Sequence, residues 1–198
     1  MARWQPNARE RLEVAALDEF EARGYQNVTV SEIASRAGVT ERTFYRHYAD
    51  KREVLFAGQH LLLDLIAEHL RDVFGGRAWL SLAEAFTAIG RLIDGRAPLA
   101  RRRQHVVDST EALRERELAK LDLVTRFTSQ ALTDAGISSD HSAYLARCAT
   151  AAFDVAFAQW IDEPESTAHP TLLAERVRKS FASLPIALAD EGTSTSSR

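Results

Sequence analysis

The strongest constraint on the fold is a stretch that begins at Thr29 and runs TVSEIASRAGVTERTFYRHYADK. Thr29 and Glu32 have the spacing of a capping box, in which each side chain bonds the other residue's backbone amide at the start of a helix. That helix should end at Gly38, because glycine enters the left-handed conformation without a Cβ penalty. Thr40 is placed to cap a second helix directly afterwards. Two short helices joined by a tight glycine turn predict a helix-turn-helix over about residues 30–49.

The second of these helices should extend only from about Glu41 to Tyr48, since the sequence DKRE from Asp50 has the spacing of another capping box. Eight residues are too few for a helix that is stable alone, so one face must be buried. Helical spacing predicts this face to consist of Ile33, Ala34, Ala37, Phe44 and Tyr48. The outward side chains are then Glu41, Arg42, Thr43, Tyr45, Arg46 and His47. Such groups can bond phosphates and base edges, so we expect double-stranded operator DNA as the partner.

The same region fits a longer pattern, with an aromatic residue in a preceding helix, a Gly-Tyr pair and regularly spaced positions through the helix-turn-helix. The matching positions are Phe20, Gly24, Tyr25, Thr29, Ile33, Ala34, Ala37, Gly38, Val39, Thr40, Phe44, Tyr45, His47, Tyr48 and Lys51. Over about residues 7–56 this pattern resembles the DNA-binding domain of TetR-type transcriptional regulators. The resemblance implies an all-α fold, with a three-helix DNA-binding domain followed by a six-helix ligand-binding and dimerisation domain.

The resemblance also implies roles for individual side chains. Five residues are expected to bind phosphate: Thr29, Thr40, Tyr45, His47 and Lys51. Their hydroxyl, imidazole and ammonium groups set the register and carry little sequence information. Arg42 and Thr43 are placed for base edges, and Arg42 could hold a guanine through O6 and N7. Arg46 could touch either backbone or base. Glu41 has three possible roles: it accepts from a cytosine amine, pairs with a basic neighbour, or favours the helix N-terminus.

The helical pattern continues along the whole chain, and no alternating strand pattern competes with it. We expect the DNA-binding domain over residues 1–50, the second domain over residues 51–191 and a disordered tail over residues 192–198. A first helix should run from Asn7 to Gly24. Later helices are predicted over residues 51 to about 74, 79–94, 98–107, 109–135, 139–161 and 170–189. The residues before the first helix, Arg3 and Trp4, could reach DNA.

Three segments follow the patterns ARRRxxV, LxERELxKL and AFxxW, at residues 100–106, 113–121 and 156–160. With these landmarks, residues 99–123 in particular resemble the C-terminal domain of an actinobacterial branch of these regulators thought to bind ligands like fatty acyl-CoA. An apolar tube between helices would take an acyl chain, and an arginine cluster over residues 101–103 could meet its phosphates through bidentate bonds. The alternative is a solvated basic patch that pairs with Glu115 and Glu117. The candidate ligand residues are Trp79, Phe86, Arg102, Phe127, Phe157 and Trp160. Ordinary core packing is the competing explanation for each of the aromatic ones.

A homodimer follows from the way such motifs bind DNA. One recognition helix covers few base pairs, so specificity needs two half-sites about 34–36 Å apart, or a multiple of that distance, presented by a two-fold dimer. The helices that begin at Ser139 and Pro170 are the expected interface. Small residues that would permit close approach there are Ala146, Ala149, Ala152 and Ala156. We expect a repressor that a small hydrophobic ligand, such as a fatty acyl-CoA, releases by moving the helix over residues 51–74. An activator with the same architecture is possible.

Charge and composition fit this interpretation. The formal net charge is −3, but residues 42–52 carry four basic residues against one acidic residue, so a local basic edge can exist on an acidic protein. The single cysteine, Cys148, excludes an internal disulfide and fits a reducing cytoplasm, and the N-terminus shows no secretion signal. The most apolar helical stretch, over residues 61–70, is interrupted by Asp64 and Glu68, so we expect a cytoplasmic protein without a membrane contact.

No catalytic motif for a nucleophilic hydrolase, a P-loop or a zinc protease is present, so we expect no enzyme and no cofactor. His60, Asp64 and Glu68 share one helix face, but a solvated face explains them better than a metal site. The remaining alternative is a helical carrier of lipid or acyl-CoA that keeps a degenerate motif without specific DNA binding.

Overall fold

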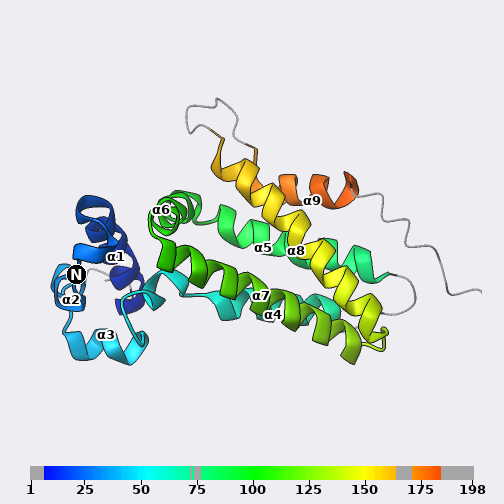
Figure 1. Ribbon diagram of the computed structural model, residues 1–198, viewed down its shortest axis with the longest axis horizontal. Coiled ribbons are helices and arrows are strands. Elements are labelled where there is room, and N and C mark those ends of the chain that lie inside the picture. Colours follow the sequence, from blue (N-terminus) through cyan, green and yellow to red (C-terminus); the bar gives the residue numbers. More distant parts are fainter. Residues whose placement is uncertain (1–6, 72, 74–76, 164–170, 184–198) are drawn as a thin grey trace, which may run out of the picture. The chain divides into compact units, whose positions relative to one another are not determined.

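The computed structural model describes residues 7–71, 73, 77–163 and 171–183. Every regular element in these ranges is helical, and nine are α-helices, so the predicted all-α fold is confirmed (Figure 1). The helices are α1 (Ala8–Arg23), α2 (Val30–Arg36), α3 (Glu41–His47), α4 (Gln59–Leu70), α5 (Ala78–Asp94), α6 (Ala97–Asp108), α7 (Glu111–Asp134), α8 (Ser139–Ile161) and α9 (Leu173–Ser183). Short 3₁₀ turns span Tyr25–Asn27 and Glu53–Phe56. Arg3, Trp4, Phe74, Pro170 and the expected tail over residues 192–198 lie outside the described residues.

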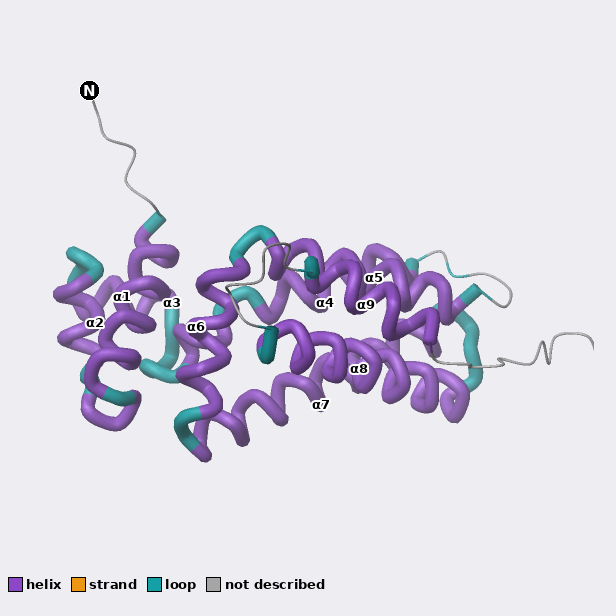
Figure 2. The backbone as a smooth tube through the Cα atoms, turned by 90° about the horizontal axis from the view of Figure 1, so that it is seen from above, coloured by secondary structure: helices purple, strands orange, loops and turns teal. Residues whose placement is uncertain are grey.

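The helices group into two compact units (Figure 2). The first unit contains the chain up to Gln59 together with Pro98–Leu118, and the second contains His60–Ala97 and the chain from Ala119 onward. The expected division at residue 50 did not anticipate that α6 and the start of α7 group with α1, α2 and α3. They do so because buried side chains of α6 and α7 belong to the apolar core of the first unit. These side chains are Val106, Val107 and Leu113.

The core of the first unit is built from the faces that helical spacing predicted. On α1 these are Leu12, Ala16 and Phe20. The predicted inward residues of the helix-turn-helix, Ile33, Ala34, Ala37, Phe44 and Tyr48, are all at most 6% exposed. A seven-residue helix such as α3 is therefore held by tertiary contacts rather than by its own length.

The prediction that one continuous helix starts at Lys51 is wrong for its first eight residues. The Asp50 carboxylate accepts bonds from the amides of Arg52 (2.8 Å) and Glu53 (3.1 Å), but these open a 3₁₀ turn. Three consecutive side chains of this turn, Val54, Leu55 and Phe56, are buried, which a single face of an α-helix does not allow. Gly58 then adopts a φ of +89°, and α4 begins only at Gln59.

In the second unit α9 packs against both α5 and α8. Gly90 of α5 lies so close to α9 that an added Cβ would come within 2.8 Å of the Ala174 Cα. The Asp94 carboxylate caps α9 by accepting from the amides of Leu173 (2.8 Å) and Ala174 (3.0 Å). The Ser180 hydroxyl of α9 also donates a hydrogen bond to the Ala152 carbonyl of α8 (2.8 Å).

The small residues of α8 do not form an open seam for a partner. Ala146, Ala149, Ala152 and Ala156 are at most 4% exposed within this one chain. Their predicted role in close approach between protomers is therefore wrong, since their small volume serves packing inside the second unit. No helix in the described part of the chain is long and apolar enough to cross a membrane.

Candidate nucleic-acid interface

The helix-turn-helix forms through local capping. The amide of Thr29 donates to the Glu32 carboxylate (2.8 Å) and the amide of Glu32 donates to the Thr29 hydroxyl (3.3 Å), which confirms the predicted capping box. Gly38 takes the left-handed conformation, with a φ of +66°. The Thr40 hydroxyl then accepts from the amide of Thr43 (3.2 Å) and caps α3. The starts of α2 and α3 are therefore fixed by bonds between residues close in sequence.

The two faces of α3 differ sharply. Phe44 is fully buried, and its ring lies 5.5 Å from the ring of Tyr48. On the opposite face Glu41, Arg42 and Arg46 are exposed, and Tyr45 is 54% exposed. A row of exposed basic, aromatic and acidic groups on a short, firmly packed helix can bond both phosphate and base edges.

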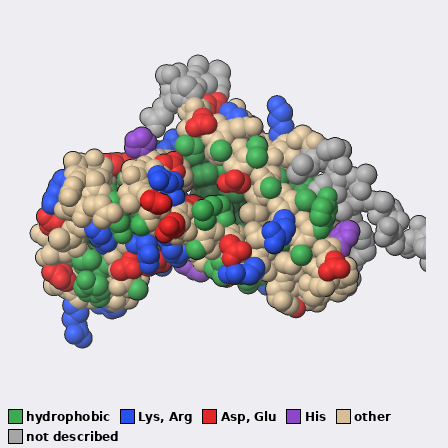
Figure 3. Space-filling model, viewed as in Figure 1, with side chains coloured by type: hydrophobic (Ala, Val, Ile, Leu, Met, Phe, Trp, Pro, Cys, Tyr) green, Lys and Arg blue, Asp and Glu red, His purple; other side chains and the backbone are tan. Residues whose placement is uncertain are grey.

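The remaining two predicted residues of α3 are half-buried. The Thr43 hydroxyl lies 3.1 Å from the Thr40 hydroxyl, so it takes part in the cap of α3. The His47 Nε2 atom lies 3.5 Å from the Arg46 Nη2 atom, so these two side chains are neighbours in the last turn of α3. Figure 3 shows basic side chains on the surface over the α3 region.

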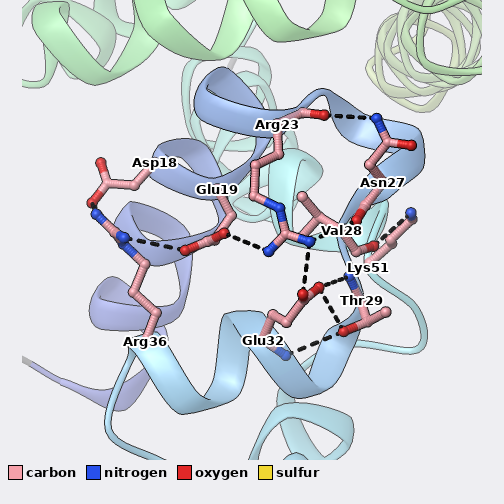
Figure 4. Close-up of polar contacts among 9 residues, drawn as sticks. All are labelled: Asp18, Glu19, Arg23, Asn27, Val28, Thr29, Glu32, Arg36 and Lys51. Carbon is pink, nitrogen blue, oxygen red and sulfur yellow. Dashed lines mark hydrogen bonds and ion pairs between the residues drawn. The ribbon is translucent and has the colours of Figure 1, made fainter.

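Ion pairs fasten both ends of α2 to α1 (Figure 4). At its N-terminus Glu32 pairs with Arg23 (2.7 Å). Bonds from the Thr29 amide, from Arg23 and from the Thr29 hydroxyl lower the pKa of Glu32 to about 2. At its C-terminus Arg36 binds Asp18 (3.0 Å) and Glu19 (3.1 Å). The first helix of the motif therefore has a charged tether at each end, in addition to its apolar face.

Lys51 lies behind the turn that precedes α2. Its Nζ donates to the carbonyls of Tyr25 (2.7 Å) and Val28 (2.8 Å) and lies 4.4 Å from the centre of the Tyr25 ring. Burial lowers the pKa of this ammonium. The geometry gives Lys51 a structural role that the sequence pattern did not reveal, because its acceptors are backbone carbonyls more than twenty residues earlier. Its predicted phosphate contact stays a prediction.

Comparison with known proteins places this motif. The sequence model of the family described as "Bacterial regulatory proteins, tetR family" matches residues 14–57, which contain most of α1 and all of α2 and α3. Over residues 14–57 the chain is thus similar to the TetR family. It is 37% identical over 90 residues to the HTH-type transcriptional regulator TcmR of Streptomyces glaucescens, covering 44% of this chain and 39% of TcmR. It is 44% identical over 50 residues to the HTH-type transcriptional regulator YdgC of Bacillus subtilis, a quarter of each chain. The matches thus span less than half of these TetR-type relatives.

Solved TetR-type structures match over a much larger part of the chain. The Thermus thermophilus FadR in complex with lauroyl-CoA is 25% identical, with a TM-score of 0.53 over 88% of this chain and 91% of that one. The Bacillus subtilis FadR in complex with stearoyl-CoA is 18% identical, with a TM-score of 0.59 over 87% and 95%, and shows the shared fold. The matching family model and TcmR are both described as regulators.

Of the six predicted ligand residues, four lie in one aromatic cluster, and Phe127 and Arg102 lie outside it. Four of the aromatic ones join a chain of ring contacts in the second unit together with Phe153 and Phe181. The distances between ring centres are 4.8 Å for Trp79–Phe181, 5.7 Å for Phe86–Phe181, 5.7 Å for Phe86–Phe153, 6.1 Å for Phe153–Phe157 and 5.9 Å for Phe157–Trp160. Phe127 is half-buried on α7. Sequence reasoning missed Phe181, although Leu173, Val177 and Phe181 repeat at i+4 along α9.

Arg102 lies in the first unit, where carboxylates surround it. Its guanidinium binds Glu21 through two bonds (2.9 and 2.6 Å) and Asp18 through a third (2.7 Å). Arg103 pairs with Glu117, the partner named in the solvated-patch alternative, but both side chains are only 16% exposed, so this pair is not a solvated one. The Arg103 guanidinium also lies 4.7 Å from the centre of the Phe56 ring. The partners of Arg102 precede it by more than eighty residues in the sequence. The only sequence feature that could have indicated this contact was the i, i+3 spacing of Asp18 and Glu21, which places both carboxylates on one face of α1. Its predicted ligand contact stays a prediction.

Proposed function

We propose that the protein is a DNA-binding transcriptional regulator of the TetR type that inserts α3 into the major groove of its operator. The observation that carries this proposal is the exposed face of α3, where Arg42, Tyr45 and Arg46 project from a helix whose other face is anchored by Phe44. Arg42 is exposed near the helix N-terminus, the part of a recognition helix that contacts base edges. Arg46 and Tyr45 are suited to phosphate, and their exposure leaves them free to adjust to it.

The regulator acts as a homodimer in this proposal. Exposed apolar residues on α8 support it: Tyr144 is 57% exposed and Val155 is 53% exposed, while Ala151 and Ala158 between and beyond them are also exposed. Their intervals of seven, four and three residues place them along one side of α8. A contiguous apolar strip on a long helix is unfavourable in water and suits contact with a second copy.

A small hydrophobic effector binds the second unit and lowers operator affinity in this proposal, so the regulator is a repressor. The aromatic cluster from Trp79 to Trp160 supports an apolar ligand, since sites for such ligands are lined mainly by hydrophobic and aromatic side chains. A fatty acyl-CoA is the first class to test, because the FadR structures of similar fold hold lauroyl-CoA and stearoyl-CoA.

Selection of bound fragments from genomic DNA tests the DNA-binding proposal. The wild-type protein should enrich a small set of fragments that share an inverted repeat, whereas a variant with Arg42→Ala and Arg46→Ala should enrich none of them. Both side chains are exposed, so this variant should keep the wild-type fold. Equal recovery of all fragments by the two proteins would contradict the proposal and favour the carrier alternative.

Titration of the enriched operator with lauroyl-CoA tests the effector class. We expect operator affinity to fall at least tenfold at saturation, with free CoA as the control that lacks the acyl chain. An operator affinity unchanged by saturating lauroyl-CoA would remove long acyl-CoA as the effector while leaving the DNA-binding proposal intact.

A further inference from the structure

One carboxylate on α1 joins two arginines from different helices. Asp18 accepts from Arg102 of α6 through Oδ1 (2.7 Å) and from Arg36 of α2 through Oδ2 (3.0 and 3.2 Å). Burial opposes its ionisation, but the bonds from the two guanidinium groups outweigh that effect and lower the pKa of Asp18. The charged carboxylate is thus a bridge between α6 and α2, and neither arginine can shift without changing the bonds of the other.

The grip of α6 on α1 has a fixed geometry. Besides Asp18, Arg102 binds both oxygens of Glu21 in a fork, the arrangement in which a guanidinium is least free to rotate. The side chains are only 33% (Arg102), 29% (Asp18) and 32% (Glu21) exposed. Because Val106 and Val107 of α6 are buried in the core of the first unit, the backbone that carries Arg102 is held as well. Figure 3 shows acidic and basic side chains side by side over this region.

From Asp18 the charged contacts continue to the other end of α2 (Figure 4). Arg36 also binds Glu19 (3.1 Å), Glu19 binds Arg23 (3.3 Å), and Arg23 binds Glu32 (2.7 Å). Glu32 is the residue that closes the capping box with Thr29. An uninterrupted series of ion pairs therefore runs from α6, along α1, to both ends of α2.

We propose that Arg102 is a positioning residue for the helix-turn-helix, and that α6 sets the DNA affinity of α3 by gripping or releasing Asp18. The proposal rests on the proposed DNA-binding function and names a part of its regulation. When α6 releases Asp18, that carboxylate becomes more solvated and holds Arg36 less firmly. Arg36 keeps its bond to Glu19, but the C-terminal end of α2 loosens. That end carries the turn to α3, where the amide of Val39 donates to the Ala34 carbonyl (2.9 Å), so α3 loosens with it.

Arg102→Gln tests the grip in the DNA-free protein by hydrogen exchange. We expect the amides of Ala37 and Val39, which bond the carbonyls of Ile33 and Ala34, to exchange at least threefold faster than in the wild type. Arg126→Gln is the matched control, because Arg126 forms an ion pair of similar length with Asp122 (2.6 Å) on α7 of the second unit. It should leave these amides unchanged. Arg102→Lys should restore part of the protection of these amides from exchange, since an ammonium can still bind one of the two carboxylates, Asp18 or Glu21.

The second arm measures operator affinity. Arg102→Gln and Asp18→Asn should each weaken binding about three- to tenfold, and the double variant should weaken it no further than the stronger single one, because both break the same bridge. The slope of affinity against salt should equal that of the wild type, since Arg102 contacts no phosphate in this account. Thermal unfolding of each variant checks that the fold persists, and Glu21→Gln, which leaves the Asp18 bridge in place, should give a smaller effect.

Unchanged exchange of the α2 amides in Arg102→Gln would overturn the proposal, and so would additive losses in the double variant. A reduced salt slope would also overturn it, because Arg102 would then act by touching DNA. If the wild-type protein binds no duplex, the proposed function fails, and the exchange arm still decides whether α6 holds α2.

Discussion

Arg42 is the side chain on which sequence recognition depends in this account. It projects from the first turn of α3, is exposed, and can form two bonds to a guanine in the major groove. Arg42→Ala should therefore remove preference at one base pair per half-site, a loss of about 1–3 kcal/mol of discrimination. Binding to a set of operators with single substitutions measures it. Tyr45→Phe is the comparison, because loss of a phosphate contact should weaken every operator alike, and an equal loss on all operators for Arg42→Ala would exclude it from base recognition.

Lys51 illustrates a residue whose contacts the sequence pattern did not indicate. Its ammonium bonds the carbonyls of Tyr25 and Val28, and these lose their partner in Lys51→Met. The site is partly solvated, so we expect a decrease of about 1–2 kcal/mol in the free energy of unfolding. Urea denaturation in the absence of DNA measures it. A variant as stable as the wild type would show that these two bonds do not stabilise the fold.

At the scale of elements, local chemistry explains what could be predicted. The starts of α2 and α3 followed from Thr29 and Thr40, because a cap is a bond between residues close in sequence. The break before α4 could not be predicted in this way. It depends on burial of three consecutive side chains, Val54 to Phe56, which is a property of the folded core and has no helical period.

The crossing of α5 and α9 provides a test at the same scale. In Gly90→Ala the added Cβ would clash with the backbone of Ala174, at 2.8 Å from its Cα. Because backbone yields less than a side chain end, we expect a loss of about 1–3 kcal/mol in unfolding free energy. Gly95→Ala is the matched control, since its Cβ would meet its nearest atom at an ordinary 3.5 Å and its φ is −60°. Thermal unfolding that places both variants at the wild-type midpoint would show that this close approach does not limit stability.

At the scale of the whole molecule, linear order predicted the sequence of helices but not the grouping of α6 with the motif. The bonds that fasten α6, such as Arg102 to Asp18, join residues 84 positions apart, and nothing local in either segment indicates the other. The same limit applies to α8. Its alanines suited a close helix contact, and only the fold shows that this contact lies inside the chain.

Dimerisation is the test at this scale. Val155→Asp places a charge in the exposed apolar strip of α8, so we expect a monomer at concentrations where the wild type is a dimer. Leu80→Glu, at another exposed apolar residue of the second unit (49% exposed), should leave the dimer unchanged. Sedimentation equilibrium gives the masses. A Val155→Asp variant with the mass of the wild type would move the interface away from this strip.

The most direct test of the central claim is the affinity of the full chain for its enriched operator as a function of salt concentration. If α3 of each protomer lies in a major groove, log affinity should fall linearly with log salt, with a slope of about −0.9 per phosphate contact. Operator binding should remain well above binding to unrelated duplex throughout. Absence of duplex binding at low salt, or an affinity independent of salt, would contradict the account.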